Sequence, residues 1–271
     1  MNDRFGWNAS LMFRTIRPVF CVPLKILMVF LFCAVSHSAY SGDWITNYYQ
    51  QPTPENFVSE VRGWSASGLL SGNKSYALAV FLGRVMAKNL REIDSWLNQL
   101  DDLNGEDRET LLLAAALSNT QEAKSYLELR PNGARHTGRL MDVRKIDANN
   151  PLVLDALWFD FFATGEAVPI RRIVTALNYE KYAPAVKPDF EGKRSKNDVT
   201  LGMTFLAARW SLTSNAKQHR RVGEILEKLF LSGDLTQPET MWVSSILAQA
   251  LPDKFELKIR SDEATLIKKA P

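Results

Sequence analysis

Residues 151–165 have the sequence PLVLDALWFDFFATG. The proline after Asn150 suits a first helical position, and Thr164-Gly165 is a polar break at which a helix can end. Between these ends the segment is apolar almost all round, as in a helix at the centre of a domain. Asp155 and Asp160 interrupt it about 140° apart on the helical wheel, so we expect at least one carboxylate to be poorly solvated.

Asp160 needs a partner if this helix is buried, and the nearest arginines in the sequence follow the break. We expect the next helix to fold back across Thr164-Gly165, which would bring Asp160 near Arg171 or Arg172. Two roles fit the carboxylate: an ion pair that locks the two helices, or a ligand-binding acid in a groove. The candidate binding residues are therefore Trp158, Asp160, Arg171 and Arg172.

Helix signals recur along the chain, and strand signals are few, so the predicted fold class is all-α. Prolines stand at first helical positions in Thr53-Pro54 and Gln237-Pro238 as well as at 151. Helices are expected over residues 55–68, 75–87, 90–100, 106–117 and 120–129. Gly68 would end the first in the left-handed conformation, and Ser118-Asn119 would cap the start of the helix over 120–129. Further helices are expected on both sides of Thr164-Gly165 and of Thr213-Ser214-Asn215, and the final one ends before Pro252.

The helices are expected to pack as pairs. Residues 85–100 and 161–177 share a layout of helix, polar break and helix. Because such pairs bury their apolar faces by stacking on neighbours, the predicted architecture is an irregular α-solenoid-like stack of helix pairs. One irregular helical globule is the alternative, since no fixed period repeats.

The expected division is a leader over 1–41, an N-terminal helical half over 42–130, a linker over 131–148, a C-terminal helical half over 149–251 and a tail over 252–271. Residues 178–198 are polar and contain two prolines, which predicts a long loop. Residues 255–260 alternate apolar and polar side chains, the pattern of a half-buried strand. This strand would pair with residues 140–146, or the segment is a frayed tail.

The leader has the layout of a secretory signal peptide. A basic stretch precedes the apolar residues 26–35, and the small residues Ala39 and Ser41 precede a cleavage point before Gly42. We therefore expect a periplasmic or secreted protein, with an uncleaved membrane anchor as the alternative. Both cysteines, Cys21 and Cys33, lie in the leader, so the remaining chain can form no disulfide and no thiolate metal site.

The charge balance argues against a nucleic-acid partner. The chain has 33 basic and 30 acidic residues. The leader contains four of the basic residues and one of the acidic residues, so the rest of the chain has 29 basic and 29 acidic residues. A neutral chain lacks the cationic excess that phosphate binding requires.

No catalytic, metal or cofactor site is predicted. His136 and His219 stand beside arginines and do not have ligand spacing, so we expect them on the solvated surface. Ser71-x-x-Lys74 and Ser214-x-x-Lys217 match a short motif of penicillin-recognising enzymes without its companion elements. The acidic pairs lie in polar stretches, where carboxylates stay ionised; they are Asp101-Asp102, Glu106-Asp107, and Asp189 with Glu191.

The segment Leu154-Asp155-Ala156-Leu157-Trp158 through Gly165, followed by Ile170-Arg171-Arg172-Ile173, resembles exported all-helical proteins of proteobacteria without an assigned function. The succession of helix pairs is loosely similar to tetratricopeptide-type (TPR-like) and Sel1-type repeat proteins. This resemblance implies a helical scaffold and transfers no catalytic residue.

The sequence thus favours a non-enzymatic periplasmic scaffold or adaptor that binds another envelope protein or a peptide, with no cofactor and with membrane contact only through an uncleaved leader. Two alternatives stay open: a cell-envelope hydrolase that uses acidic residues, and an immunity protein against a secreted toxin.

Export is the first testable prediction. Protein recovered from the cell envelope should have the intact mass of a chain that begins near Gly42, because the signal peptide is removed during secretion. A full-length cytoplasmic product would contradict it.

Overall fold

The computed structural model is all-α apart from one small antiparallel sheet, which confirms the predicted fold class. It describes residues 41–103, 105–130, 133–136, 141–186, 194–260 and 263–269. The predicted leader lies outside this part of the chain except for Ser41.

Apart from α1, for which the sequence predicts no helix, the N-terminal elements follow the predicted ranges closely. They are α1 (Ser41–Asn47), the 3-10 turn η3 (Pro54–Asn56), α2 (Phe57–Ala66), α3 (Ser75–Lys88), η4 (Leu90–Glu92), α4 (Ile93–Gln99), α5 (Gly105–Ser118) and α6 (Gln121–Glu128).

The C-terminal elements include the longest helix of the described chain. They are η5 (Gly133–His136), η6 (Val143–Lys145), α7 (Pro151–Thr164), α8 (Ala167–Thr175), η7 (Ala176–Val186), α9 (Lys196–Gln218), α10 (Arg220–Ser232), α11 (Gln237–Ala250), β1 (Phe255–Arg260) and β2 (Glu263–Lys268).

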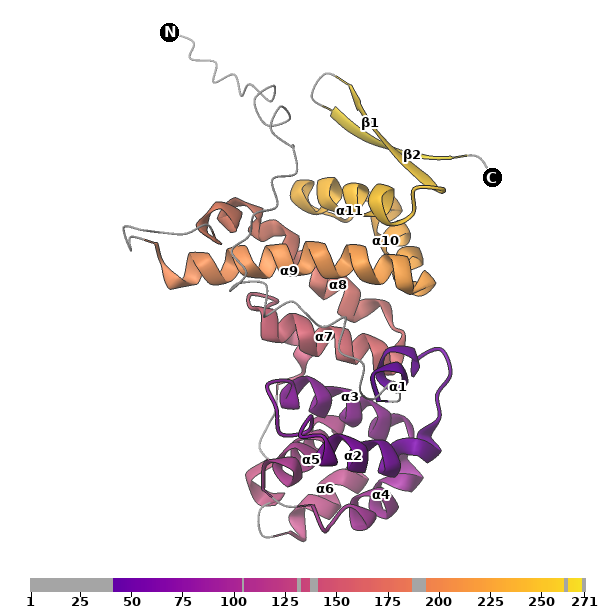
Figure 1. Ribbon diagram of the computed structural model, residues 1–271, viewed down its shortest axis with the longest axis vertical. Coiled ribbons are helices and arrows are strands. Elements are labelled where there is room, and N and C mark those ends of the chain that lie inside the picture. The colour runs from indigo at the N-terminus through magenta and orange to yellow at the C-terminus, as the bar shows by residue number, and fades with distance from the viewer. Residues whose placement is uncertain are drawn as a thin grey trace.

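These elements form an elongated pile (Figure 1). Helices α2, α4, α5 and α6 lie at one end, α7, α8 and α9 cross the middle, and α11 with the hairpin of β1 and β2 lies at the other end. One continuous apolar core runs through the whole pile, from Trp44 in α1 to Phe255 in β1.

Helix α7 is central, as its composition predicts. Nine of its fourteen residues are buried, and it packs against α3 on the N-terminal side and against α8 and α9 on the other. The side chain of Asn150 accepts a hydrogen bond from Val153 N (3.1 Å) at its start. Gly165 ends it in the left-handed conformation, with φ 67°.

The proline start signals are confirmed at α2 with its preceding turn, at α7 and at α11. The start of α6 differs from the prediction: Thr120, rather than Ser118-Asn119, accepts the capping bond from Ala123 N (3.2 Å). Ser118 instead donates to the carbonyl oxygen of Ala115 (2.6 Å), so its hydroxyl is occupied within α5.

The predicted break at Thr213-Ser214-Asn215 is wrong, because α9 runs straight through it. Thr213 donates to Arg209 O (2.8 Å) and Asn215 to Ser211 O (2.9 Å), so these side chains bond to the preceding turn and do not compete with the helix. The break between α9 and α10 falls at His219 instead.

Two C-terminal predictions need correction. The first part of the expected loop over 178–198 belongs to η7, which packs on α9, and α9 itself begins at Lys196. The strand over 255–260 exists, but it pairs with β2 rather than with residues 140–146, in an antiparallel register that sets Leu257 opposite Leu266. The next strand along the chain supplies the partner, and the buried Phe255 anchors β1 against the core.

Solenoid-like stacking of equivalent helix pairs is not confirmed. The segment predicted as a linker contributes η5 and η6, and residues of η6 contact both α7 and α8.

Gly83 marks a close crossing of α3 and α5. A Cβ atom there would lie 2.8 Å from the carbonyl oxygen of Ala114 in α5. Gly83→Ala should therefore lower the free energy of unfolding by about 1–3 kcal/mol, measured by urea denaturation, because the backbones must move apart.

Gly63 in α2 is the matched control, since a Cβ atom there would meet nothing within 4 Å. Gly63→Ala should raise the free energy of unfolding by about 0.5–1 kcal/mol through the better helix propensity of alanine. Equal effects of the two substitutions would contradict the close crossing at Gly83.

Candidate functional site

Asp160 is a fully buried carboxylate that two arginines hold. Arg144 donates from Nε and Nη2 to its two oxygens (2.6 and 2.7 Å), and Arg84 donates from the same two nitrogens (both 3.1 Å). The side chain of Asp160 has 0% exposure. Four charge-assisted bonds therefore occupy the lone pairs of Asp160 and replace the water lost on burial.

The two arginines come from different parts of the chain. Arg84 projects from α3 and Arg144 from η6, and outer acids balance both: Arg84 Nη2 bonds Asp142 (2.6 Å) and Arg144 Nη1 bonds Glu166 (2.7 Å). The hydrogen bonds that Arg144 donates to Asp160 raise the pKa of Arg144 above its usual value, although desolvation opposes this shift. The resulting ion cluster ties α3, η6 and α7 together.

The predicted pairing of Asp160 with Arg171 or Arg172 is wrong. Arg172 donates instead to the carbonyl oxygen of Ile146 (2.5 Å), and Arg171 donates to Glu239 in α11 (3.0 Å). Both arginines follow the break, as expected, but α8 directs them away from the face of α7 that carries Asp160.

Glu239 is a second buried acid that sequence reasoning missed. Its side chain is 1% exposed and accepts hydrogen bonds from Arg171 and from Asn178 Nδ2 (3.0 Å). It also caps α11, because Thr236 N donates to its other oxygen (3.0 Å) while the Thr236 hydroxyl accepts from Glu239 N (3.4 Å). The spacing Thr236-x-x-Glu239 is a capping box and was visible in the sequence.

Trp158 is buried rather than presented to a ligand. It is 5% exposed, and its indole Nε1 donates to Ser211 Oγ in α9 (3.0 Å). The four candidate residues therefore do not gather at one site: Asp160 faces α3, Trp158 faces α9, Arg171 faces α11, and Arg172 faces the segment before α7.

The prediction of a solvated His219 is also wrong. His219 is 5% exposed at the joint between α9 and α10, its ring lies 5.3 Å from the Phe162 ring, and Tyr49 Oη lies 3.3 Å from its Nδ1. Burial lowers the pKa of His219. His136 is partly buried and lies 2.9 Å from Glu109 Oε2, and no cluster of three metal-ligating side chains occurs in the described residues.

Three of the acids proposed for a hydrolase are engaged by neighbouring side chains. Asp101 pairs with Arg108, Asp102 pairs with Arg62 (2.9 Å), and Asp107 accepts from Ser65 (2.5 Å). Asp189 and Glu191 lie outside the described residues.

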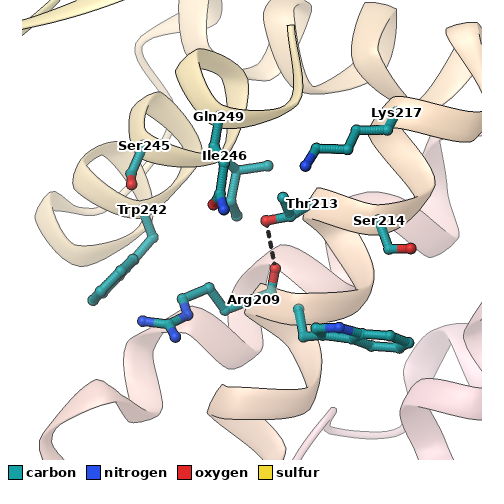
Figure 2. Close-up of a pocket in the computed structure, with 9 residues that line it drawn as sticks. Arg209, Thr213, Ser214, Lys217, Trp242, Ser245, Ile246 and Gln249 are labelled. Carbon is teal, nitrogen blue, oxygen red and sulfur yellow. Dashed lines mark hydrogen bonds between the residues drawn. The ribbon is translucent and has the colours of Figure 1, made fainter. Parts of the chain in front are cut away.

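A groove lies between α9 and α11, with a volume of about 410 Å³ (Figure 2). Its walls carry Arg209, Trp210, Thr213, Ser214 and Lys217 from α9, and Trp242, Ser245, Ile246 and Gln249 from α11. On each helix successive lining residues are one or three positions apart, a spacing that returns to the same side at every turn, so each set lies along one helical face.

Two cations and two indoles characterise this groove. Arg209 lies over the Trp242 ring, with 5.2 Å from its Cζ to the ring centroid, and Trp210 is 59% exposed. Figure 2 shows the side chains of Arg209 and Lys217 reaching from α9 toward α11. Ser214 and Lys217 share the groove, but the Ser214 hydroxyl is bonded to Gln218 Nε2 (3.0 Å).

Sequence reasoning missed the groove as a site. The predicted helix break at Thr213-Ser214-Asn215 separates residue 209 from residue 217. In the structure α9 is continuous, so residues 209, 213 and 217 share one face of one helix.

Comparisons with known protein families, with curated proteins and with solved structures found no match for this chain. Among the described residues, no helix has the length and apolar character needed to cross a bilayer.

The Asp160 cluster gives a stability prediction. Asp160→Asn removes the charge and keeps the side-chain size, so it leaves the guanidinium groups of Arg84 and Arg144 without their shared anion. We expect the free energy of unfolding in urea to fall by about 3–5 kcal/mol.

Asp102→Asn is the control, because it breaks an ion pair with Arg62 in which the Asp102 side chain is 65% exposed. Its urea midpoint should stay at the wild-type value. An unchanged midpoint for Asp160→Asn would show that the cluster does not stabilise the fold.

His219 gives a prediction about pH. Its pKa is lower in the folded chain than the ordinary value of 6.5, so the unfolded chain binds the proton more readily. The contribution of the neutral imidazole to stability is therefore complete above about pH 6.5 and is lost as the pH falls toward the folded-state pKa. The test is urea denaturation at pH values from about 7.5 to about 5, the range in which histidine side chains usually titrate. Over this range the free energy of unfolding of His219→Asn should fall less steeply than that of the wild type. Identical pH profiles would contradict burial of a neutral His219.

Proposed function

We propose that this chain is an exported, non-enzymatic helical protein that binds a segment of another protein, or a peptide, in the groove between α9 and α11. The observation that carries the proposal is Trp210, a 59% exposed indole in the middle of the long helix α9, beside Arg209 and Trp242 in a groove of about 410 Å³. Tryptophan and arginine are the residue types that most often dominate binding energy at protein interfaces.

Binding fits this groove better than catalysis. A general acid and base need two titratable groups in one cleft with separated pKa values, and the nine lining residues include no carboxylate and no histidine. Ser214 and Lys217 stand three residues apart on α9, and the Ser214 hydroxyl already accepts a bond from Gln218.

A periplasmic or secreted location belongs to this proposal. It rests on the signal-peptide layout of residues 1–41 and on the confinement of both cysteines to that leader. A partner from the cell envelope, encountered after export, follows from this location.

Selection of peptides from a random displayed library on the purified chain tests the binding function. Selected peptides should bind in isothermal titration calorimetry, and Trp210→Ala should weaken them at least about tenfold, because truncation of an indole anchor removes a large contact area.

Leu129→Ala is the matched control, since Leu129 is 84% exposed and lies outside the groove. It should leave the affinity unchanged. Peptides that bind Trp210→Ala as well as wild type, or a selection that yields no binding peptide, would overturn the proposed function.

A further inference from the structure

We infer that the groove takes an extended acidic peptide whose two carboxylate side chains are four residues apart, with an apolar side chain midway between them. The inference rests on the binding function proposed above and specifies its ligand. Spacing and charge within the groove carry it.

The spacing comes from α9. Arg209, Thr213 and Lys217 succeed one another at intervals of four residues and line the same groove. At a rise of about 1.5 Å per residue, the eight steps from Arg209 to Lys217 cover about 12 Å along the helix. Two cations therefore stand at the two ends of one wall.

The charge in the groove is unbalanced. None of its nine lining residues is acidic, and within the part of the chain that the structure describes, neither Arg209 nor Lys217 has a salt bridge to a carboxylate. Arg209 is positioned by its indole contact instead, so its guanidinium edge keeps donors for an incoming anion. The chain outside the leader is neutral, so this pair of cations is a local feature rather than part of a basic surface.

The dimensions match an extended peptide. Side chains on one side of an extended chain recur every second residue, and those four residues apart are separated by about 13 Å. Two carboxylates with this separation would meet Arg209 and Lys217 together. The residue midway between them would face Ile246 and Thr213, and Ile246 supplies the apolar contact.

The test uses a capped heptapeptide, Gly-Glu-Ala-Leu-Ala-Glu-Gly, titrated into the purified chain by calorimetry at low and at high salt. Binding should weaken with salt, and Arg209→Gln and Lys217→Gln should each reduce affinity at least about tenfold. Lys258→Gln, which changes an exposed lysine of β1 outside the groove, should have no effect.

Two further peptides separate spacing from charge. A peptide of the same composition with adjacent glutamates, Gly-Glu-Glu-Leu-Ala-Ala-Gly, should bind more weakly, and one with both glutamates replaced by glutamine should bind most weakly. Unfolding midpoints of Arg209→Gln and Lys217→Gln in urea establish that both variants are folded.

The outcomes distinguish this inference from the function on which it rests. If library-selected peptides need Trp210 but carry no acidic pair and are insensitive to salt and to Arg209→Gln, the binding function stands and the acidic ligand is wrong. If the heptapeptide does not bind and vesicles of phosphatidylglycerol bind in a manner that requires Arg209 and Lys217, the anion is a lipid headgroup and the peptide inference is overturned.

Discussion

The burial of the Asp160 carboxylate is the constraint on which the arrangement of the N-terminal part depends. With 0% of its side chain exposed, the charge must be matched inside the protein, and one arginine would leave lone pairs unsatisfied. Arg84 and Arg144 both bind it in bidentate fashion. Because Arg84 belongs to α3 and Arg144 to η6, the pairing aligns α3 with α7 and draws the segment before α7 onto the core. Apolar contacts alone, being non-directional, would not select this alignment.

A similar arrangement fixes the walls of the groove. Glu239, 1% exposed, connects the start of α11 to Arg171 of α8, and Trp158 of α7 connects to Ser211 of α9 through its indole nitrogen. Each directional bond holds one wall to the central helices. Three of the four candidate binding residues (Asp160, Arg171 and Trp158) thus stabilise the interior, and the groove itself is lined by other residues.

The groove differs from these buried clusters in how its charges are balanced. Inside the protein, Asp160 and Glu239 each have arginine partners, as desolvated charges require. In the groove, Arg209 is held against Trp242 and Lys217 is exposed on α9, and none of the nine described lining residues is acidic. Solvated cations tolerate this imbalance at little cost, so they remain available to a ligand. This contrast is the physical basis for assigning binding to the groove and stability to the clusters.

The sequence by itself determined the fold class, most helix bounds and the centrality of α7, because helical periodicity, proline starts and the cap at Gly165 are local properties. It also indicated that at least one of Asp155 and Asp160 would be poorly solvated. Only the tertiary structure decided which arginines meet it, since Arg84 lies 76 residues away and α8 turns Arg171 toward Glu239. The burial of His219 and the continuity of α9 through Thr213-Ser214-Asn215 were likewise decided by packing. Thr213 and Asn215 donate hydrogen bonds to carbonyl oxygens of the preceding turn of α9, and the packing of the neighbouring helices holds that turn in place. Their low helix propensity therefore does not interrupt α9.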